Sequence, residues 1–174
     1  NPPFGATFTW YLKDELKTKK KQRQEAEKKA IKAGQDVFYP TWDALKAEDQ
    51  EEEPKVVLTV QDAGGQVVRR LNAGATAGLH RTTWDLRYPA SVPASQLGRG
   101  DSEFDRGPAG PLVAPGSYTV SVATWSDGVA TPVGTPQTFE VKPLLSPSLP
   151  VRDPAALLAF QRKVARLKCA AIGL

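Results

Sequence analysis

Apolar and polar residues alternate with period two in several separated segments, and this alternation limits the folds open to the chain. It is clearest in Leu79–Leu86 and Ser117–Trp125, which flank a long loop rich in proline and glycine. Successive side chains of a strand point to opposite faces, so the alternation predicts strands with one buried face. Trp84 and Tyr118 fall on the predicted inner face.

The same alternation recurs elsewhere and predicts more strands, at Ala6–Leu12, Lys55–Asp62, Gln66–Leu71 and Gln137–Lys142. The Ala-Gly-Gly turn at 63–65 predicts a hairpin between two of them. With 15 prolines and 14 glycines, turn signals are frequent along the chain. Short strands separated by regular turn signals are typical of two antiparallel sheets packed face to face. The predicted fold is therefore mostly β, a two-sheet β-sandwich.

A charged segment at 13–53 interrupts this pattern and predicts a helical insertion. Lys13–Ala33 favours a solvated helix that ends at Gly34, and Thr41 is a suitable N-cap for a second helix. Residues 13–32 carry nine basic and four acidic side chains, and residues 36–53 carry seven acidic ones against Lys46 alone. We expect the two helices to complement each other, which argues against a nucleic-acid partner.

The C-terminal part of the chain reads as a linker followed by a helix. Residues 143–152 are rich in proline, and Asp153-Pro154 is a favourable helix start. The predicted helix, 153–172, carries an apolar stripe of Leu157, Phe160, Val164 and Leu167. Such a stripe needs a partner, which can be the sandwich, the first helix or another surface. Self-association through the stripe is one hypothesis. The predicted organisation is a sandwich at 1–142, the linker and this amphipathic helix.

Composition adds few constraints on function. The chain has no methionine and opens with Asn1-Pro2-Pro3, so we expect a piece of a longer polypeptide. Its single cysteine, Cys169, excludes an internal disulfide. No apolar run of membrane-spanning length is present, and we expect no membrane partner. The sequence leaves the cellular compartment open.

Three motifs carry a resemblance to a known family. Their residues are Val68, Arg69 and Leu71; Ala77, Gly78, His80, Trp84 and Asp85; and Pro115, Gly116, Tyr118 and Val120. Together with the opening segment 1–16, they resemble the immunoglobulin-like domain of the flagellar hook-capping protein. They are still more similar to the version found C-terminal to bacterial BNR-repeat, sortilin-type β-propellers that carry a glycosyl hydrolase label.

The resemblance implies an immunoglobulin-like sandwich that serves as an accessory domain of a propeller protein, secreted or periplasmic. The propeller itself lies outside this chain, so the hydrolase label does not transfer to it. Two features depart from the family pattern. The helical insertion is longer than the connection typical of the family, and Leu86 stands where the family often has glycine.

The motif residues have structural roles in this interpretation. Trp84 supplies a large plate between the sheets, and burying it contributes roughly 2–3 kcal/mol. Asp85 is expected to accept hydrogen bonds from backbone amides of the following loop, or to pair with Arg87 or Arg81. Gly116 is expected at a positive φ in the turn before Tyr118.

Candidate chemistry is sparse. His80, the only histidine, has no nucleophile or acid partner signalled in the sequence, so a structural, hydrogen-bonded role is favoured. Asp101, Glu103 and Asp105 alternate as calcium ligands can, but they do not form an EF-hand and acids are common in solvent loops. We expect no catalytic residue, no metal and no cofactor.

Three aromatic side chains, Tyr11, Trp42 and Trp125, point away from the predicted core. If they are exposed, their rings suit sugar binding or a protein interface. If the helical insertion folds back over a sheet, they become core residues, and this second outcome is favoured. The predicted function is a non-catalytic accessory domain that packs on a propeller or mediates protein–protein contact. The alternative is a carbohydrate-binding module of a glycosidase-like parent.

Overall fold

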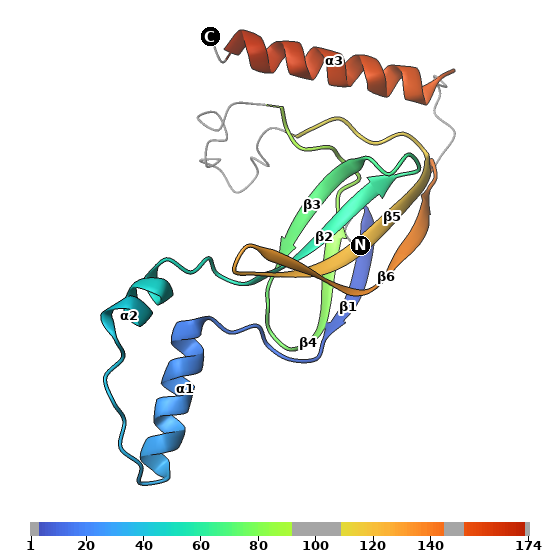
Figure 1. The fold of residues 1–174 in the computed structure, drawn as a ribbon. Coiled ribbons are helices and arrows are strands. Elements are labelled where there is room, and N and C mark those ends of the chain that lie inside the picture. Colours follow the sequence, from blue (N-terminus) through green and yellow to red (C-terminus); the bar gives the residue numbers. More distant parts are fainter. Residues whose placement is uncertain (1–3, 92–108, 145–151, 173–174) are drawn as a thin grey trace.

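The computed structural model describes residues 4–91, 109–144 and 152–172 (Figure 1). The elements in chain order are β1 (Ala6–Leu12), α1 (Lys19–Lys32), α2 (Trp42–Asp49), β2 (Lys55–Asp62), β3 (Val67–Ala73), β4 (Gly78–Trp84), β5 (Gly116–Ser126), β6 (Val129–Val141) and α3 (Pro154–Ile172). None of the described helices is long and apolar enough to cross a membrane.

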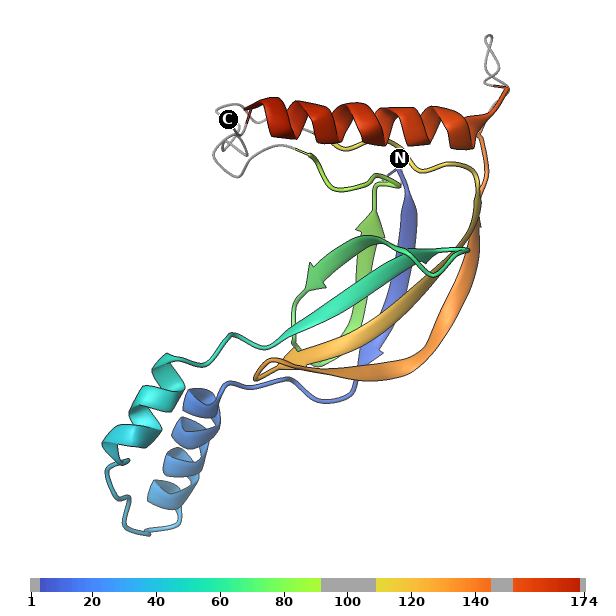
Figure 2. The same ribbon diagram turned by 45° about the horizontal axis from the view of Figure 1, so that its top comes forward.

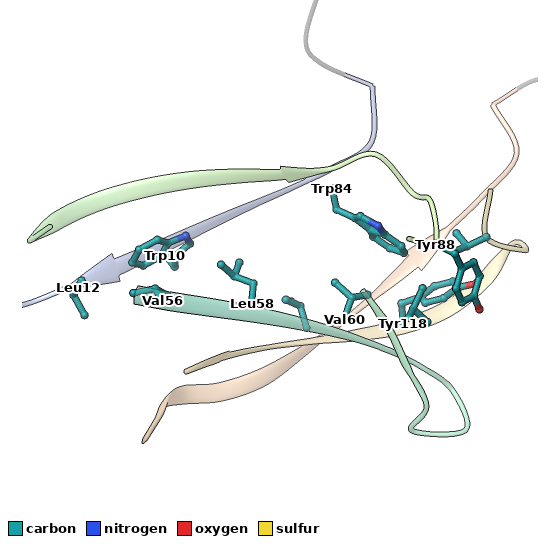
Figure 3. Packing of buried hydrophobic residues seen from close by; sticks show 11 residues of the cluster. Trp10, Leu12, Val56, Leu58, Val60, Trp84, Tyr88 and Tyr118 are labelled. Carbon is teal, nitrogen blue, oxygen red and sulfur yellow. The ribbon is translucent and has the colours of Figure 1, made fainter. Parts of the chain in front are cut away.

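The strands form two antiparallel sheets that face each other. One sheet pairs β1 with β4, and the other has the order β3-β2-β5-β6. Side chains from both sheets meet in one apolar core (Figure 3). The predicted two-sheet, sandwich-like β fold is therefore confirmed at this level.

Strand β2 lies at the centre of the larger sheet and shows why the alternation was informative. It pairs with β3 on one side and with β5 on the other. Val56, Leu58 and Val60 are fully buried, while the residues between them are half-buried. A strand flanked on both sides keeps one face entirely against the core, so its apolar side chains recur at every second position.

Trp84 lies between the two sheets and has no exposed surface. Its indole N–H donates a hydrogen bond to the carbonyl of Arg87 over 3.0 Å. Its ring meets those of Tyr118 and Phe139 edge-on, with centroids 5.8 and 6.3 Å apart. The polar atom of this large side chain is thus satisfied while its rings fill the core.

The last strand is longer than the sequence pattern predicted. We expected it at Gln137–Lys142, but β6 begins at Val129. Pro132, Gly134 and Pro136 weaken the strand signal in the missed part. The structure tolerates them because β6 is an edge strand. On its outer side there is no neighbouring strand in the described part of the chain, so a proline can lack the backbone N–H there without the loss of a hydrogen bond between strands.

The helices of the insertion are shorter than predicted. α1 begins at Lys19 because the Thr18 hydroxyl accepts a hydrogen bond from the Lys21 amide. Gly34 follows α1 with a φ of +68°, as its predicted capping role requires. Thr41 caps α2, which ends at Asp49 before the remaining acidic residues.

The two insertion helices project from one end of the sandwich (Figures 1 and 2). Neither helix contains a buried residue. The prediction that the insertion folds back over a sheet is therefore wrong. Two contacts hold the base of the insertion against the sandwich. The Leu16 amide donates a hydrogen bond to the carbonyl of Ala75, and Lys19 forms an ion pair with Asp127.

Helix α3 lies across the other end of the sandwich (Figure 2). Leu158 packs against the core, and the guanidinium of Arg162 lies 4.6 Å from the centre of the Tyr88 ring. The predicted apolar stripe faces elsewhere, and Phe160 and Leu167 remain 64% and 62% exposed. Within the described residues, neither the sandwich nor α1 covers this stripe.

Candidate functional site

His80 is engaged in structural contacts. Its Nε2 atom lies 2.7 Å from the carbonyl oxygen of Thr76, and its ring stacks on Trp10 with centroids 4.4 Å apart. The indole N–H of Trp10 in turn donates to the Thr82 hydroxyl. These contacts hold the imidazole beside Trp10 and engage one of its two ring nitrogens.

The other motif residues organise the loops at the end of the sandwich. The Asp85 carboxylate accepts a hydrogen bond from the Arg87 amide over 3.2 Å, the first of the two roles considered for it. Gly116 has a φ of +155°. The Tyr118 hydroxyl donates to the carbonyl of Ala114 over 2.7 Å, so this side chain ties strand β5 to the preceding turn.

The candidate calcium ligands Asp101, Glu103 and Asp105 lie outside the described residues. Within the described part of the chain, no group of three or more histidine, cysteine or carboxylate side chains is placed to hold a metal ion.

The three aromatic candidates lie on different elements and are not alike. Trp42 is 78% exposed and Tyr11 is 61% exposed. Trp125 is only half-exposed, and its indole N–H donates to a carboxylate oxygen of Glu52 over 3.0 Å. This bond and a second one from Lys55 lower the pKa of Glu52 below its ordinary value, the lysine contributing more.

The structure adds two aromatic residues to Trp42. Phe38 and Tyr39, in the loop between α1 and α2, are each 86% exposed. We call Val37, Phe38, Tyr39 and Trp42 the aromatic tip; they lie in the connection from α1 to α2 and at the first position of α2, and all four are exposed. The sequence signal for this tip was available, since an apolar run between two solvated helices has no core of its own to enter.

Opposite charges join the two helices below the aromatic tip. The guanidinium of Arg23 donates to both carboxylate oxygens of Glu48, over 2.6 and 2.9 Å, and to Glu27 on its own helix. The bond to Arg23 lowers the pKa of Glu48, and the bonds to Glu48 and Glu27 raise the pKa of Arg23. The predicted complementarity of the basic and acidic segments is confirmed.

A cleft of about 810 Å³ opens at the other end, between the edge strand β3, the loop after β4 and helix α3. We call it the arginine cleft, because its lining includes Arg69 and Arg70 from β3 and Arg162 and Arg166 from α3. Sequence reasoning did not find it. The two pairs are far apart along the chain, and neither forms a recognisable motif by itself.

Tyr88 forms part of the cleft wall and is buried. Burial raises the pKa of its hydroxyl, and the nearby charge of Arg162 partly offsets this rise. Its amide donates to the carbonyl of Pro111, which pins the two arms of the long loop together. The wall of the cleft is thus anchored to the sandwich.

The sequence matches none of the protein-family models and none of the curated proteins with which it was compared. Candidate surfaces are therefore defined by geometry. They are the aromatic tip, the exposed stripe of α3 and the arginine cleft.

Proposed function

We propose that this chain is a non-catalytic accessory domain that packs on a neighbouring β-propeller or mediates protein–protein contact. The observation that carries the proposal is the apolar stripe of α3, which stays exposed although the helix is docked on the sandwich. A contiguous exposed apolar surface is costly in water and marks an interface more often than an ordinary surface. The stripe supplies large side chains of the kind that anchor interfaces.

An immunoglobulin-like type of sandwich is part of this proposal. Trp84 between the sheets supports it, as does the bond from the Tyr118 hydroxyl to a backbone carbonyl a few residues upstream. Such a tyrosine near the start of a strand is a hallmark of immunoglobulin-like domains. The resemblance of the motif residues to the hook-capping and propeller-associated domains supports the same assignment.

The contacts of His80 favour a non-catalytic role. One ring nitrogen is bonded to a backbone carbonyl and one ring face is covered by Trp10. The stacking on Trp10 joins β4 to β1 and the bond to Thr76 ties β4 to the preceding loop, so both contacts are accounted for without a substrate.

The aromatic tip favours a second function, carbohydrate binding. Exposed rings can stack on the faces of sugar rings, and Phe38, Tyr39 and Trp42 are the most exposed aromatic residues in the described chain. Trp125 is less suited, because its indole N–H is already bonded to Glu52.

Association with the polypeptide encoded directly upstream of Asn1 tests the first function. The two polypeptides, expressed separately, are expected to form a complex in analytical ultracentrifugation. Phe160→Asp combined with Leu167→Asp is expected to abolish it, while Phe38→Asp at the aromatic tip leaves it intact. An upstream sequence without propeller repeats, or no association, would contradict the proposed partner.

Affinity electrophoresis in gels containing soluble polysaccharides tests the second function. A carbohydrate-binding module is expected to be retarded, and Trp42→Ala should reduce the retardation more than Trp125→Ala. Unchanged mobility in every polysaccharide would eliminate this alternative.

A further inference from the structure

We propose that the arginine cleft binds a small ligand carrying two or more oxyanion groups, such as phosphates or carboxylates. The proposal goes beyond the accessory role, because it rests on different residues from the stripe of α3. It starts from the charge of the lining. Among the described lining residues, four arginines and one aspartate, Asp85, give a formal excess of three positive charges.

These arginines lack partners of opposite charge within the described residues. None of the seven ion pairs there includes Arg69, Arg70, Arg162 or Arg166. In the helical insertion, by contrast, Arg23 forms ion pairs with both Glu27 and Glu48. Gathering like charges around one cleft is unfavourable until an anion enters it.

The two walls of the cleft are held in place by contacts to the sandwich and to each other. On one side, Arg69 lies in β3, in register with the buried Val60 of β2. On the other side, Leu158 packs α3 on the core, and Arg162 lies over the ring of Tyr88. A guanidinium over an aromatic face is stabilised by the ring's electron density, which orients its donors.

The loop between the walls is closely packed. Gly110 has no room for a side chain, because a Cβ atom there would lie 2.0 Å from the carbonyl oxygen of Tyr88. The guanidinium of Arg87 also donates to the carbonyl of Gly110 over 2.9 Å. These contacts join the two arms of the loop and give the cleft a fixed wall. A preformed wall lowers the entropy lost when a ligand binds.

The chemistry of the lining selects the ligand class. Each guanidinium offers several N–H donors in a planar fork that matches the oxygens of phosphate or carboxylate. The cleft volume falls within the range of about 300–1,000 Å³ that is usual for small-molecule sites. Arginines on both walls suit a ligand with anionic groups at more than one point.

The test uses the whole chain and two probes, inorganic pyrophosphate and citrate, each titrated separately and followed by NMR. Saturable amide shifts are expected in three segments, 67–70, 85–91 and 162–166. Binding of pyrophosphate alone identifies a phosphate-bearing ligand, and binding of citrate alone identifies a polycarboxylate. If neither probe binds, the proposal is overturned.

The variant Arg69→Gln/Arg162→Gln removes one guanidinium from each wall. Its affinity for the bound probe should fall on the order of tenfold to a hundredfold, because two charge-assisted hydrogen bonds are lost. The matched control Arg81→Gln/Arg152→Gln removes the same charge outside the cleft and should retain its affinity. Equal losses in both variants would show a non-specific effect of net charge and overturn the proposal.

A second variant guards against misfolding. Arg69→Lys/Arg162→Lys keeps the charge but lacks the planar fork, so its affinity should lie between those of the wild type and the glutamine variant. Amide shifts confined to the lysine-rich helix α1 in any of these titrations would also overturn the proposed site.

Discussion

In the sandwich, the largest fully buried side chains are all apolar and lie between two sheets, whereas neither helix of the projecting pair has a buried residue. The sandwich coheres through area removed from water, which salt and pH hardly change. The helical pair coheres through ion pairs and capping bonds, which salt and acid weaken. One chain therefore contains a robust region and a region that responds to its solvent.

This difference explains where the candidate surfaces lie. The sandwich places its largest buried side chains between the sheets, although Tyr11 and Leu79 remain exposed, and among the described residues no buried polar side-chain atom lacks a partner. The large apolar groups of the helical pair and of α3, by contrast, point outward. The added helices thus present side chains to partners on a scaffold that is stable without those partners.

Replacing a tryptophan in each region should separate the two most sharply. Trp84→Ala removes a fully buried side chain and should lower the free energy of unfolding by about 3–5 kcal/mol. Trp42→Ala removes an exposed one and should change it by less than about 0.5 kcal/mol. Urea denaturation followed by far-UV circular dichroism measures both. Similar losses would show that the helical pair shares the core.

A pair of glycine substitutions tests how tightly the loop beside the core is packed. Gly110→Ala should destabilise by roughly 1–3 kcal/mol, because the added methyl group meets the backbone of Tyr88 and Pro89. Gly74→Ala has open space around it and should change stability by less than about 1 kcal/mol. Thermal unfolding of both variants gives the comparison, and a neutral Gly110→Ala would mean that the loop is loosely held.

A capping substitution probes the helical pair alone. Thr18→Ala removes the hydroxyl that accepts from the Lys21 amide and should destabilise α1 by about 1 kcal/mol. Amide exchange should quicken in α1 and stay unchanged in β2. If global stability falls by the same amount, the helical pair and the sandwich unfold together, which would contradict their separation.

Acid should loosen the helical pair before it affects the sandwich. The bond to Arg23 lowers the pKa of Glu48 from its ordinary value of 4.5, so the pair stabilises the fold above that pH. This stabilisation is lost as the pH falls through the lowered pKa. Protection factors of the α1 amides, which correct for the intrinsic pH dependence of exchange, should be lower at pH 3 than at pH 6, and Glu48→Gln should remove most of that difference. An unchanged pH response in Glu48→Gln would assign the effect to other carboxylates.

The sequence predicted the elements whose signals are local. Val56, Leu58 and Val60 alternate because one face of β2 packs against the core, and Thr41 marks a helix start by its own hydroxyl. The first part of β6 was missed, since Pro132 and Gly134 carry turn signals that an edge strand overrides through its pairing with β5. Local patterns do not reveal a strand's position in the sheet.

The candidate surfaces depended on long-range placement and could not be predicted from the sequence. Trp42 could be assigned to core or surface only once the direction of the helical pair was known. Arg69 and Arg162 meet at one cleft because α3 docks beside β3. The stripe of Phe160 and Leu167 was visible, but the face on which α3 docks is set by Leu158 and Arg162.

Native-state hydrogen exchange, measured residue by residue over a series of low urea concentrations, tests the separation of the two regions directly. Amides of β2 and β5 should exchange only through global unfolding, while those of α1 and α2 should exchange through a local opening of much lower free energy. If the amides of α1 and α2 instead require the same free energy of opening as those of β2, the helical pair belongs to the cooperative core, and the division proposed for this chain is incorrect.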